Sequence, residues 1–446
     1  MKKITLLLCA FCALPALAQE HFSGLTTSKR VGILNGNMNP SEFANLGSRF
    51  EVQIFGLSAN ASSNKVGFGD LVGGDNLEDL IFAGNEPVNF TTNAEIAFPG
   101  FAFKALGWGF GISAGGHITA NVIDVDSNLG RALVNNDFNA TTAAAIIDNS
   151  GNQRVNATVW GEIGFSAARK IFENDKHRIN GGITLKLLFP GSYANMGAGD
   201  FSGTIDYSTG DPILRNASAN VNIAYSGNFA DSFTESSDYT SSVFGKLKGM
   251  ATDIGFDYQW KSGSSYKLKV GMAVKNIGSM TFKSDKNKSI NYKLEMDAGD
   301  ALNLNEFNNA ESLSDIEAIL NRPENDFFTE TSETNDFKVK LPTVLNLYAD
   351  YNLISKLNLT LFLQQKMNKD EGNNQIASQN IFSVTPRVNL GFFEAFLPVS
   401  FNEISGTTAG FGFRLSGFYL GSNSVLTAIG DGKQADAYFG YRFGFL

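Results

Sequence analysis

The sequence predicts an all-β protein that crosses a membrane as a closed, antiparallel, up-and-down β-barrel. Large apolar residues alternate with small or polar ones along many segments, which is the period of a β-strand. The gaps between these segments are long and short in turn. The chain also begins like an exported precursor, and no later apolar run has the length of a membrane-spanning helix. Together these features predict about fourteen strands, with about sixteen as the alternative.

The first part of the chain has the form of a secretory signal peptide. Two lysines precede an apolar stretch, Ile4–Leu17, and a small-residue pattern suited to cleavage follows at Ala18. The stretch is about 15 residues long, which is short for a membrane-spanning helix. We therefore expect residues 1–18 to be removed after export. Both cysteines, Cys9 and Cys12, fall in this segment, so the remaining chain forms no disulfide bond.

The alternation is clearest in Trp108–Val122. Even positions there are mostly large and apolar, whereas odd positions hold Gly, Ser, His, Thr or Asn. On a strand these positions lie on opposite faces, so one face can meet lipid and the other a polar lumen. A soluble β-sandwich would also alternate, but its strands usually have about 5–6 residues, whereas several of these segments reach about ten or more. The same pattern recurs in Val155–Ser166, Ile179–Leu187, Asp253–Trp260, Tyr266–Lys275 and Leu357–Gln364.

Gap lengths predict the topology. Bacterial outer-membrane barrels have tight turns in the periplasm and long loops outside the cell. The same order here places both termini in the periplasm, which requires an even number of strands. The long gaps are 61–88, 123–153, 280–336 and 367–377, and the tight ones are 106–107, 173–176, 354–355 and 393–394.

The predicted strands leave two points open. An even number requires one strand more than the clear ones, and residues 419–428 are the best candidate. Residues 200–208 and 219–228 either add two further strands or form a hairpin in an outer loop. The clear strands cover residues 49–59, 90–105, 108–122, 154–169, 178–189, 246–260, 265–279, 337–352, 356–366, 379–392, 395–404, 408–418 and 435–446.

Two segments outside the strands have a predicted form. Asn309–Leu320 has helical spacing within an outer loop, and Ser314 is a suitable N-cap for a short helix. Residues 19–47 precede the first strand and are expected to form a short periplasmic or plug segment. Residues 48–446 then form the barrel with its long extracellular loops.

The C-terminus resembles the signal that the barrel-assembly machinery reads. Tyr438, Gly440, Phe443 and Phe445 occupy its polar, glycine and aromatic positions, and Leu446 is an extra final residue. Alternation places the aromatic residues with odd numbers on the lipid side of this strand. We therefore expect outer-membrane lipid and the assembly machinery among the partners.

Two segments resemble known families. Asn37–Leu46, with Asn39 and Pro40, resembles the Asn-Pro-Ala segment that opens the barrel of FadL-like hydrophobic-compound transporters; Ser41 stands where that family has Ala. This resemblance implies transport of a hydrophobic molecule. Ala409–Leu426 is similar to an uncharacterised family of outer-membrane barrels with a domain of unknown function. This second resemblance covers more of the chain and implies a whole-chain barrel with no assigned activity.

The inward face of the predicted barrel carries charges of both signs. One interpretation is an ion-pair network that satisfies buried polar groups and fills the lumen. The other is a charged pore wall that selects what passes. Mixed charge does not favour a general diffusion porin. The residues expected to face the lumen are Glu95, His117, Glu162, Lys186, Asp253, Asp257, Lys267, Lys269, Lys275, Asp350, Lys366, Arg387, Arg414 and Arg442.

The sequence predicts neither catalysis nor a cofactor. His117 is the one histidine expected to face the lumen, and no nucleophile motif accompanies it. Paired histidine ligands for a metal are absent from the sequence, and the formal charge of −9 argues against nucleic acid as a partner.

Two functions stay open. The first is transport of a small hydrophobic or amphipathic compound, suggested by the Asn-Pro segment and the expected plug. The second is a non-transporting surface barrel that acts as an adhesin, an anchor or a subunit of a surface complex. It is suggested by the long acidic outer loops, above all 280–336. The oligomeric state is left undetermined by the sequence.

Overall fold

The computed structural model describes most of the chain as one closed antiparallel sheet. The described residues are 21–73, 77–134, 144–227, 246–263, 265–283, 287–430 and 432–445. The expected signal peptide lies outside these ranges, as does the final leucine. In the described ranges, no helix combines the length and apolar character needed to cross a membrane.

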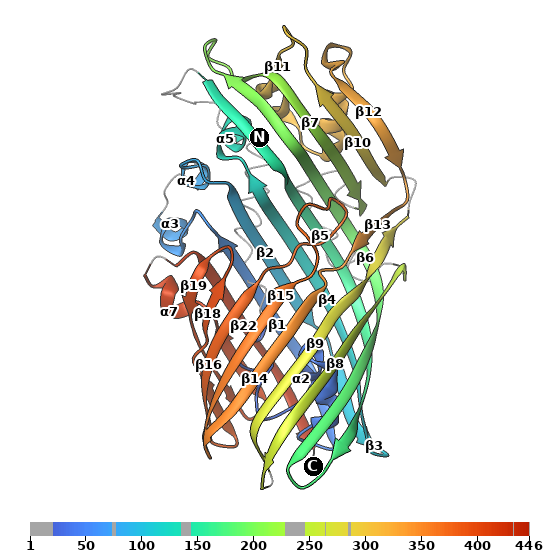
Figure 1. The fold of residues 1–446 in the computed structure, drawn as a ribbon, viewed down its shortest axis with the longest axis vertical. Coiled ribbons are helices and arrows are strands. Elements are labelled where there is room, and N and C mark those ends of the chain that lie inside the picture. Colours follow the sequence, from blue (N-terminus) through green and yellow to red (C-terminus); the bar gives the residue numbers. More distant parts are fainter. Residues whose placement is uncertain are drawn as a thin grey trace.

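Fourteen strands form the ring of the barrel, which confirms the predicted number. The first and last strands close it, with Phe50 opposite Phe445. All neighbours are antiparallel, and Figure 1 shows the strands tilted around the barrel. In ring order they are β1 (Phe50–Ser63), β2 (Val88–Ala97) with β3 (Gly100–Ala105), β4 (Trp108–Val125), β5 (Ala144–Glu173), β6 (His177–Asp206), β8 (Gly249–Ser262), β9 (Ser265–Phe282), β13 (Phe337–Lys340) with β14 (Val344–Ile354), β15 (Leu357–Lys366), β16 (Ile381–Asn389), β17 (Phe393–Phe396) with β18 (Val399–Asn402), β19 (Gly406–Ala409) with β20 (Phe411–Leu415), β21 (Phe418–Ser422) and β22 (Gln434–Phe445).

Several ring strands are interrupted rather than continuous. Pro99, Pro342 and Pro398 lie at the breaks within β2/β3, β13/β14 and β17/β18. Proline has no amide hydrogen for the strand ladder, so each break falls where the sequence cannot sustain regular pairing. The segments on either side still continue around the same ring.

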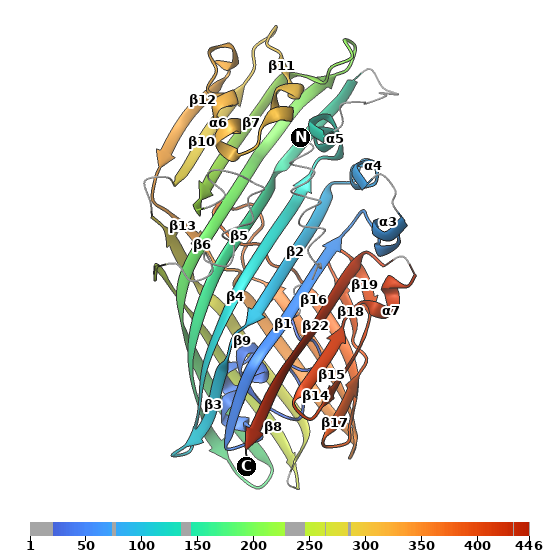
Figure 2. The same ribbon diagram turned by 180° about the vertical axis from the view of Figure 1, so that it is seen from behind.

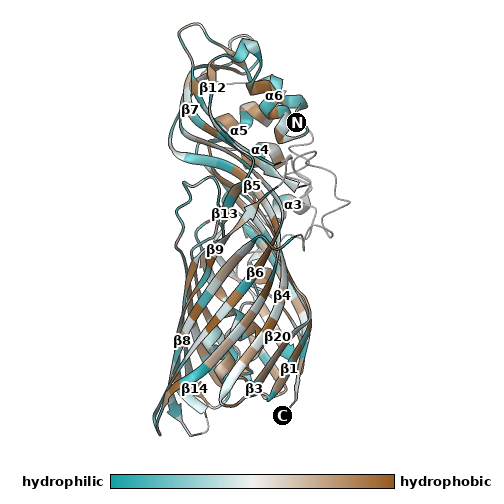
Figure 3. Cartoon of the chain, turned by 90° about the vertical axis from the view of Figure 1, so that its right-hand side faces the viewer, coloured by the Kyte–Doolittle hydropathy of each residue, from teal (hydrophilic) through white to brown (hydrophobic). Residues whose placement is uncertain are grey.

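The barrel has an apolar exterior and a polar interior. On β6, Ile183 is 50% exposed and Leu185 is 41% exposed, whereas the intervening Thr184 and the following Lys186 are buried. The last strand alternates as expected, with Tyr441 at 40% exposed and Arg442 at 0%. Figure 3 shows hydrophobic residues distributed along the strands of the barrel wall. This inversion of the usual globular pattern is the form of a membrane-spanning barrel.

Two strands, β5 and β6, extend far beyond the ring and carry an extension of the sheet at the loop end, the end opposite the tight turns; we call this extension the loop-end sheet. The first part of β6 pairs with β8, whereas its last part pairs with β7 (Ile213–Ser226). The sheet continues through β10 (Lys288–Glu295), β11 (Leu302–Asn303) and β12 (Phe328–Thr334). The hairpin alternative for the predicted segments 200–208 and 219–228 is therefore correct.

Helices cover one face of this loop-end sheet (Figure 2). The shared hydrophobic core includes Ile223, Ile290 and Ile316, and the covering helices are α5 (Ser127–Val134), η3 (Leu304–Asn309) and α6 (Leu313–Leu320). The predicted outer-loop helix is present but shorter. Its N-cap is Ser312, whose hydroxyl accepts from the Asp315 amide at 3.1 Å, so the expected cap at Ser314 was wrong. The remaining short helices at the loop end are α3 (Phe68–Gly73), α4 (Leu77–Ile81), η4 (Pro323–Asn325) and α7 (Val425–Ala428).

Two boundary predictions were wrong near the C-terminus. The expected turn at 393–394 lies three residues earlier, at 390–392, where Gly391 adopts φ 88°, the left-handed conformation that favours glycine. Glu394 consequently lies on β17 and is 1% exposed. The expected strand at 419–428 exists as β21, but it ends at Ser422, because the chain then turns into α7.

The segment before β1 lies inside the ring at its turn end. It contains α2 (Ile33–Met38) and η1 (Pro40–Asn45), neither of which was predicted. Figure 1 shows α2 in the lower half of the barrel, surrounded by strands. The wall lacks side chains where this segment approaches it: a Cβ at Gly182 would lie 2.5 Å from the Pro40 carbonyl carbon. We refer to residues 21–47 as the N-terminal segment.

Candidate functional site

A polar cavity of about 150 Å³ lies in the lumen. Its wall comes mainly from β2, β4, β5, β6, β8 and β9. His21 and Asn37 of the N-terminal segment line it, and so do Ala377 and Ser378 from the loop between β15 and β16. That loop folds inward, because the Ile376 amide donates to the Lys340 carbonyl at 3.0 Å. The cavity is thus bounded by the barrel wall, the N-terminal segment and one loop.

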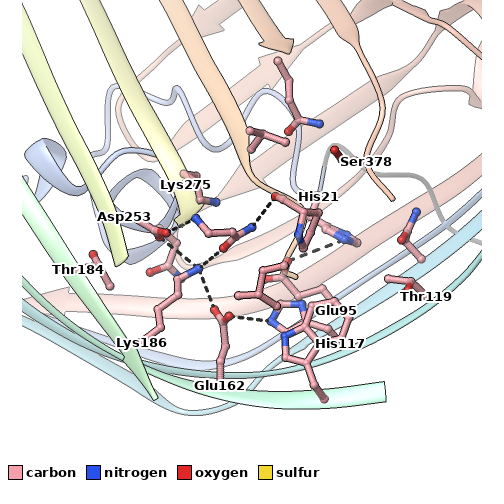
Figure 4. Close-up of a pocket in the computed structure, with 18 of the residues that line it drawn as sticks. His21, Glu95, His117, Thr119, Glu162, Thr184, Lys186, Asp253, Lys275 and Ser378 are labelled. Atoms are coloured by element: carbon pink, nitrogen blue, oxygen red, sulfur yellow. Dashed lines mark hydrogen bonds and ion pairs between the residues drawn. The ribbon is translucent and has the colours of Figure 1, made fainter. Parts of the chain in front are cut away.

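Strand register brings the predicted lumen residues of neighbouring strands together. Glu95 on β2 is opposite His117 on β4, and His117 is opposite Trp160 on β5. The His117 ring stacks on the Trp160 ring, with centroids 4.7 Å apart and planes at 18°. Ile112 on the same strand is exposed, so it lies on the outward face of β4, as the alternation predicts. Figure 4 shows the Glu95, His117 and Glu162 side chains directed into one space.

Lys186 lies at the centre of the charged cluster. Its Nζ is 3.3 Å from Glu162 Oε1 and 3.1 Å from Asp253 Oδ2, and it donates to Asn276 Oδ1 at 2.7 Å. Glu162 also approaches His117, with Oε2 3.6 Å from Nε2. One lysine is therefore shared by two carboxylates that come from different strands, an arrangement that offsets the cost of burying each charge.

A β-bulge positions Asp253 in this cluster. The pairing of β8 and β9 shifts between Thr252 and Ile254, and Asn276 on the facing strand has φ 60°. Asparagine tolerates this left-handed conformation better than most residues. The Asn276 amide donates to Asp253 Oδ1 at 2.6 Å, so the extra residue of the bulge holds the carboxylate in place.

His21 belongs to the cavity although it lies outside the barrel strands. Its Nδ1 is 2.9 Å from Ser58 Oγ, and its Nε2 is 3.9 Å from Glu95 Oε2. No pattern in the sequence singles out this histidine. Only the position of the N-terminal segment within the ring brings it opposite the wall.

Three further buried groups of the lining have no hydrogen-bond partner among the residues that the structure describes. They are Trp160 Nε1, Thr119 Oγ1 and Ser378 Oγ, each belonging to a residue less than a tenth exposed. Buried donors and acceptors are almost always paired in proteins, either within the chain or with a bound molecule. These atoms are therefore available to something that enters the cavity.

Most of the other predicted lumen charges hold the N-terminal segment rather than the cavity. Lys366 instead pairs with Asp370 and Glu403. Lys269 forms a buried ion pair with Glu42, which also accepts from the Tyr348 hydroxyl. Arg442 lies 3.4 Å from Glu51 and donates to the Arg30 carbonyl at 3.0 Å. Asp257 accepts from Asn45 Nδ2 at 3.1 Å.

A second buried network joins the wall to the N-terminal segment. Arg387 donates to Asp350 Oδ1 at 2.6 Å, lies 3.6 Å from Glu394 and also donates to the Thr27 carbonyl. Arg414 lies 3.3 Å from Glu394 Oε2. The misplaced turn hid Glu394 from the sequence prediction. Glu42 was missed because it lies on a short helix without strand periodicity, whereas Glu51 lies at an inward position of the predicted first strand and was not singled out.

Asn39 and Pro40 lie where the N-terminal segment contacts the wall. Asn39 Nδ2 donates to the Phe256 carbonyl at 3.0 Å, and its Oδ1 caps η1 by accepting from the Ser41 amide at 3.0 Å. Pro40 begins η1, a position that suits proline because the first helical amide has no partner.

Lys267 does not join the lumen set as expected. A register shift places Trp260 opposite Leu268 but Lys261 opposite Tyr266, so Lys267 is the extra residue of β9 and has no residue opposite it on β8. Its Nζ lies 4.6 Å from the centroid of the Tyr351 ring, a side chain that is 40% exposed. Tyr266 instead reaches inward, and its hydroxyl donates to Asp350 at 2.6 Å.

The geometry contains no feature of a metal centre in the described part of the chain, where no three His, Cys, Asp or Glu side chains gather as ligands. What the cavity offers is a set of hydrogen-bonding and charged groups around a small space. It can bind a small polar molecule and orient it.

Comparisons with known proteins identify the family but no activity. No curated protein matches the sequence. Among solved structures, the chain is similar to a deletion mutant of the monoaromatic hydrocarbon channel TodX, with a TM-score of 0.47, 10% identity and coverage of 97% of this chain and 98% of that one. It is similar to the monoaromatic hydrocarbon channel CymD, with a TM-score of 0.42, 11% identity and coverage of 93% and 94%. It is also similar to a Pseudomonas aeruginosa FadL homologue, with a TM-score of 0.37, 9% identity and coverage of 96% and 98%.

Similarities at this level assign no ligand to the chain. The sequence match is more informative, because it extends from residue 44 to residue 423 and so covers most of the ring. It agrees with the resemblance of the later strands to a family of barrels with no assigned activity. The chain belongs to the family of unknown function DUF5723.

Proposed function

We propose that this protein is an outer-membrane barrel that carries a small molecule through its lumen, and that the N-terminal segment gates the passage as a plug. The observation that carries the proposal is the set of buried contacts between this segment and the wall. The ion pair of Glu42 with Lys269 and the bonds of Arg387 and Arg442 to backbone carbonyls lie on different sides of the ring. Passage would require these contacts to break or the segment to shift.

Location in the outer membrane rests on the chain itself. Export is expected from the signal-like start, and the exposed apolar wall requires lipid around it. The aromatic C-terminal strand fits recognition by the barrel-assembly machinery. Mixed charge in the lumen argues against a wide, unselective pore and supports a passage that is closed at rest.

The lining of the cavity indicates which of the expected solutes, hydrophobic or amphipathic, fits it better. Its lining includes three carboxylates and two lysines, namely Glu95, Glu162, Asp253, Lys186 and Lys275. A purely apolar solute would leave these groups desolvated and without partners, which is costly. An amphipathic or polar solute fits the lining better.

A disulfide lock tests the gating. The chain has no cysteine after residue 12, so no native cysteine in the barrel can form a disulfide with the introduced ones. A Cβ on Gly255 would lie 2.9 Å from Asn39 Cγ, which places cysteines at these two positions within disulfide reach. In liposomes, we expect the Asn39→Cys/Gly255→Cys protein to take up glycerol, lactate or toluene only after reduction.

The controls are the two single-cysteine proteins, which must be insensitive to reduction, and protein-free liposomes. Equal uptake by the oxidised and reduced double variant would show that the segment does not gate. Uptake no faster than in protein-free liposomes for all three solutes would rule out transport of this size class.

The loop-end sheet favours a second candidate, a surface barrel that binds a partner. β12 lies at the edge of this sheet, and its residues 329–334 are all exposed. In the described ranges β12 pairs only with β10, so its other edge is free to pair with a partner chain. A photo-crosslinker at Thr331 should then capture a protein in intact cells. A crosslinker at the lipid-facing Ile183 is the matched control, and no capture at Thr331 would count against this candidate.

A further inference from the structure

The lumen cavity contains a lysine that no carboxylate neutralises directly. Lys186 is bonded to both Glu162 and Asp253, so its single charge is fully engaged by these two carboxylates. Lys275 lines the same cavity, yet it forms no hydrogen bond or ion pair with any residue in the part of the chain that the structure describes. Figure 4 shows its ammonium group beside the cluster. Lys275 is half-buried and lines the cavity, so its ammonium group is open to an anionic ligand.

One carboxylate on the other side of the cavity is also incompletely satisfied. Glu95 approaches His21 at 3.9 Å, which is longer than a hydrogen bond. The cavity therefore presents an open positive group and an open negative or accepting group. A ligand that carries both an anion and a hydrogen-bond donor complements this pair, whereas a simple anion complements half of it.

Neutral groups of the lining complete the polar surface. Trp160 Nε1 is a donor, whereas the Thr119 and Ser378 hydroxyls can donate or accept. All three are buried, and none has a partner within the described ranges of the chain. A buried polar group left unpaired costs about 1–3 kcal/mol. Water can occupy such positions, and a ligand that brings matching donors and acceptors can replace it.

The size of the cavity limits the ligand. Its volume is about 150 Å³, and an engineered protein cavity of about 150 Å³ holds benzene. A ligand of roughly six to eight heavy atoms therefore fits. Larger sugars, peptides and fatty acids would extend beyond the cavity.

We propose that this cavity binds a small monocarboxylate with an adjacent amino or hydroxyl group. The carboxylate lies against Lys275 Nζ, and the adjacent group donates to Glu95. Trp160, Thr119 and Ser378 bind the remaining polar atoms of the ligand. This assignment rests on the proposed function, because it names the class of molecule that the lumen would take.

Trp160 provides a direct readout. The chain has three tryptophans, and Trp108 and Trp260 are 38% and 47% exposed on the outside of the barrel. The Trp108→Phe/Trp260→Phe protein in detergent therefore reports on the cavity through Trp160 fluorescence. We expect a saturable change with alanine or lactate, and a response at least tenfold weaker with propionate or glycerol, each of which lacks one of the two groups. A tighter response to alanine identifies amino acids, and a tighter response to lactate identifies hydroxy acids.

Lysine substitutions supply the decisive comparison. Lys275→Met should weaken binding of the tighter ligand about tenfold or more, because it removes a charged hydrogen bond. Lys267→Met is the matched control, since Lys267 lies on the same strand but outside the cavity, and it should not change binding. Lys275→Gln serves as a second variant, and retention of the folded barrel is checked by its mobility shift on heating in detergent gels.

The result that overturns the inference is a response to alanine and lactate that does not saturate, or one that is equal in the Lys275→Met and Lys267→Met proteins. Binding in detergent requires no passage through the barrel. Saturable binding without liposome uptake would therefore contradict transport alone, and uptake without binding at Trp160 would contradict this assignment alone.

Discussion

Replacing Glu42 by Gln should release the N-terminal segment from the wall. Glu42 is 1% exposed and pairs with Lys269, which is 4% exposed. It also accepts from the Tyr348 hydroxyl and from Asn45 Nδ2, the latter at 3.0 Å. The substitution keeps the shape of the side chain but leaves the lysine without its anion in a buried place.

The size of the effect follows from the burial of this pair. Removing one member of a buried ion pair costs about 3–5 kcal/mol. Asp257 also interacts electrostatically with Lys269 and remains in the variant, so the lower end applies. A cost of about 3 kcal/mol corresponds to roughly a hundredfold change in an equilibrium constant. The ring does not depend on this pair, so the effect falls on local opening of the segment.

Hydrogen exchange measures that opening. Amides of residues 33–47 should exchange about a hundredfold faster in Glu42→Gln, whereas amides of β15 stay protected. The Glu42→Gln/Lys269→Met double variant should recover part of the protection, because it removes the unpaired charge. Asp336→Asn is the control, since its pair with Lys283 is more than half exposed on both sides and should contribute little. Unchanged exchange in Glu42→Gln, or a double variant no better than the single one, would refute the reasoning.

Three further perturbations have defined outcomes. Gly182→Val should also speed exchange of residues 33–47, because a Cβ there meets the Pro40 backbone at 2.5 Å; Gly199→Ala, with its nearest atom at 3.8 Å, should leave exchange unchanged. Ser312→Ala should destabilise α6 by about 1 kcal/mol, seen as faster exchange over 313–320, while equal effects from Ser314→Ala would contradict the assignment of the cap. Burial raises the pKa of Tyr292 in the loop-end sheet to about 12. Since the folded pKa exceeds the unfolded value of about 10, this contribution to stability is complete below pH 10 and is lost as the pH rises through 12. Tyrosinate absorbance of the folded protein, compared with that of Tyr292→Phe, measures the pKa. Ionisation of Tyr292 near pH 10 in the folded protein would contradict this prediction.

Strand prediction succeeded where alternation was long and undisturbed. On β4 and β6 one face had to meet lipid and the other a polar lumen, so period-two spacing fixed both the strand and its orientation. Predictions failed where one residue interrupts the period. The bulge at Lys267 turned that side chain away from the lumen, and the turn at Gly391 moved Glu394 from a loop into the wall. A shift of one residue exchanges the two faces of a strand, and nothing local in the sequence marks it.

Contacts between distant segments could not be predicted from the sequence. His21 and Glu95 are 74 positions apart, and their approach depends on the path of the N-terminal segment through the ring. Lys269 is an ordinary inward lysine by its spacing, and its partner Glu42 sits on a short helix with no periodic signal. These pairings decide which lumen charges hold the segment and which line the cavity.

The sequence by itself determined the class of fold, the number of ring strands and the lipid-facing side of most of them, because a membrane imposes one repeating chemical pattern on every strand that crosses it. Tertiary structure alone decided what the lumen contains. The N-terminal segment, the inward loop and a lysine shared between two carboxylates meet there by three-dimensional packing. Among the described residues, they leave Lys275 without a hydrogen bond or ion pair. The contacts of interior side chains depend on which neighbours the fold brings close to them, and these neighbours do not recur with the period of a strand.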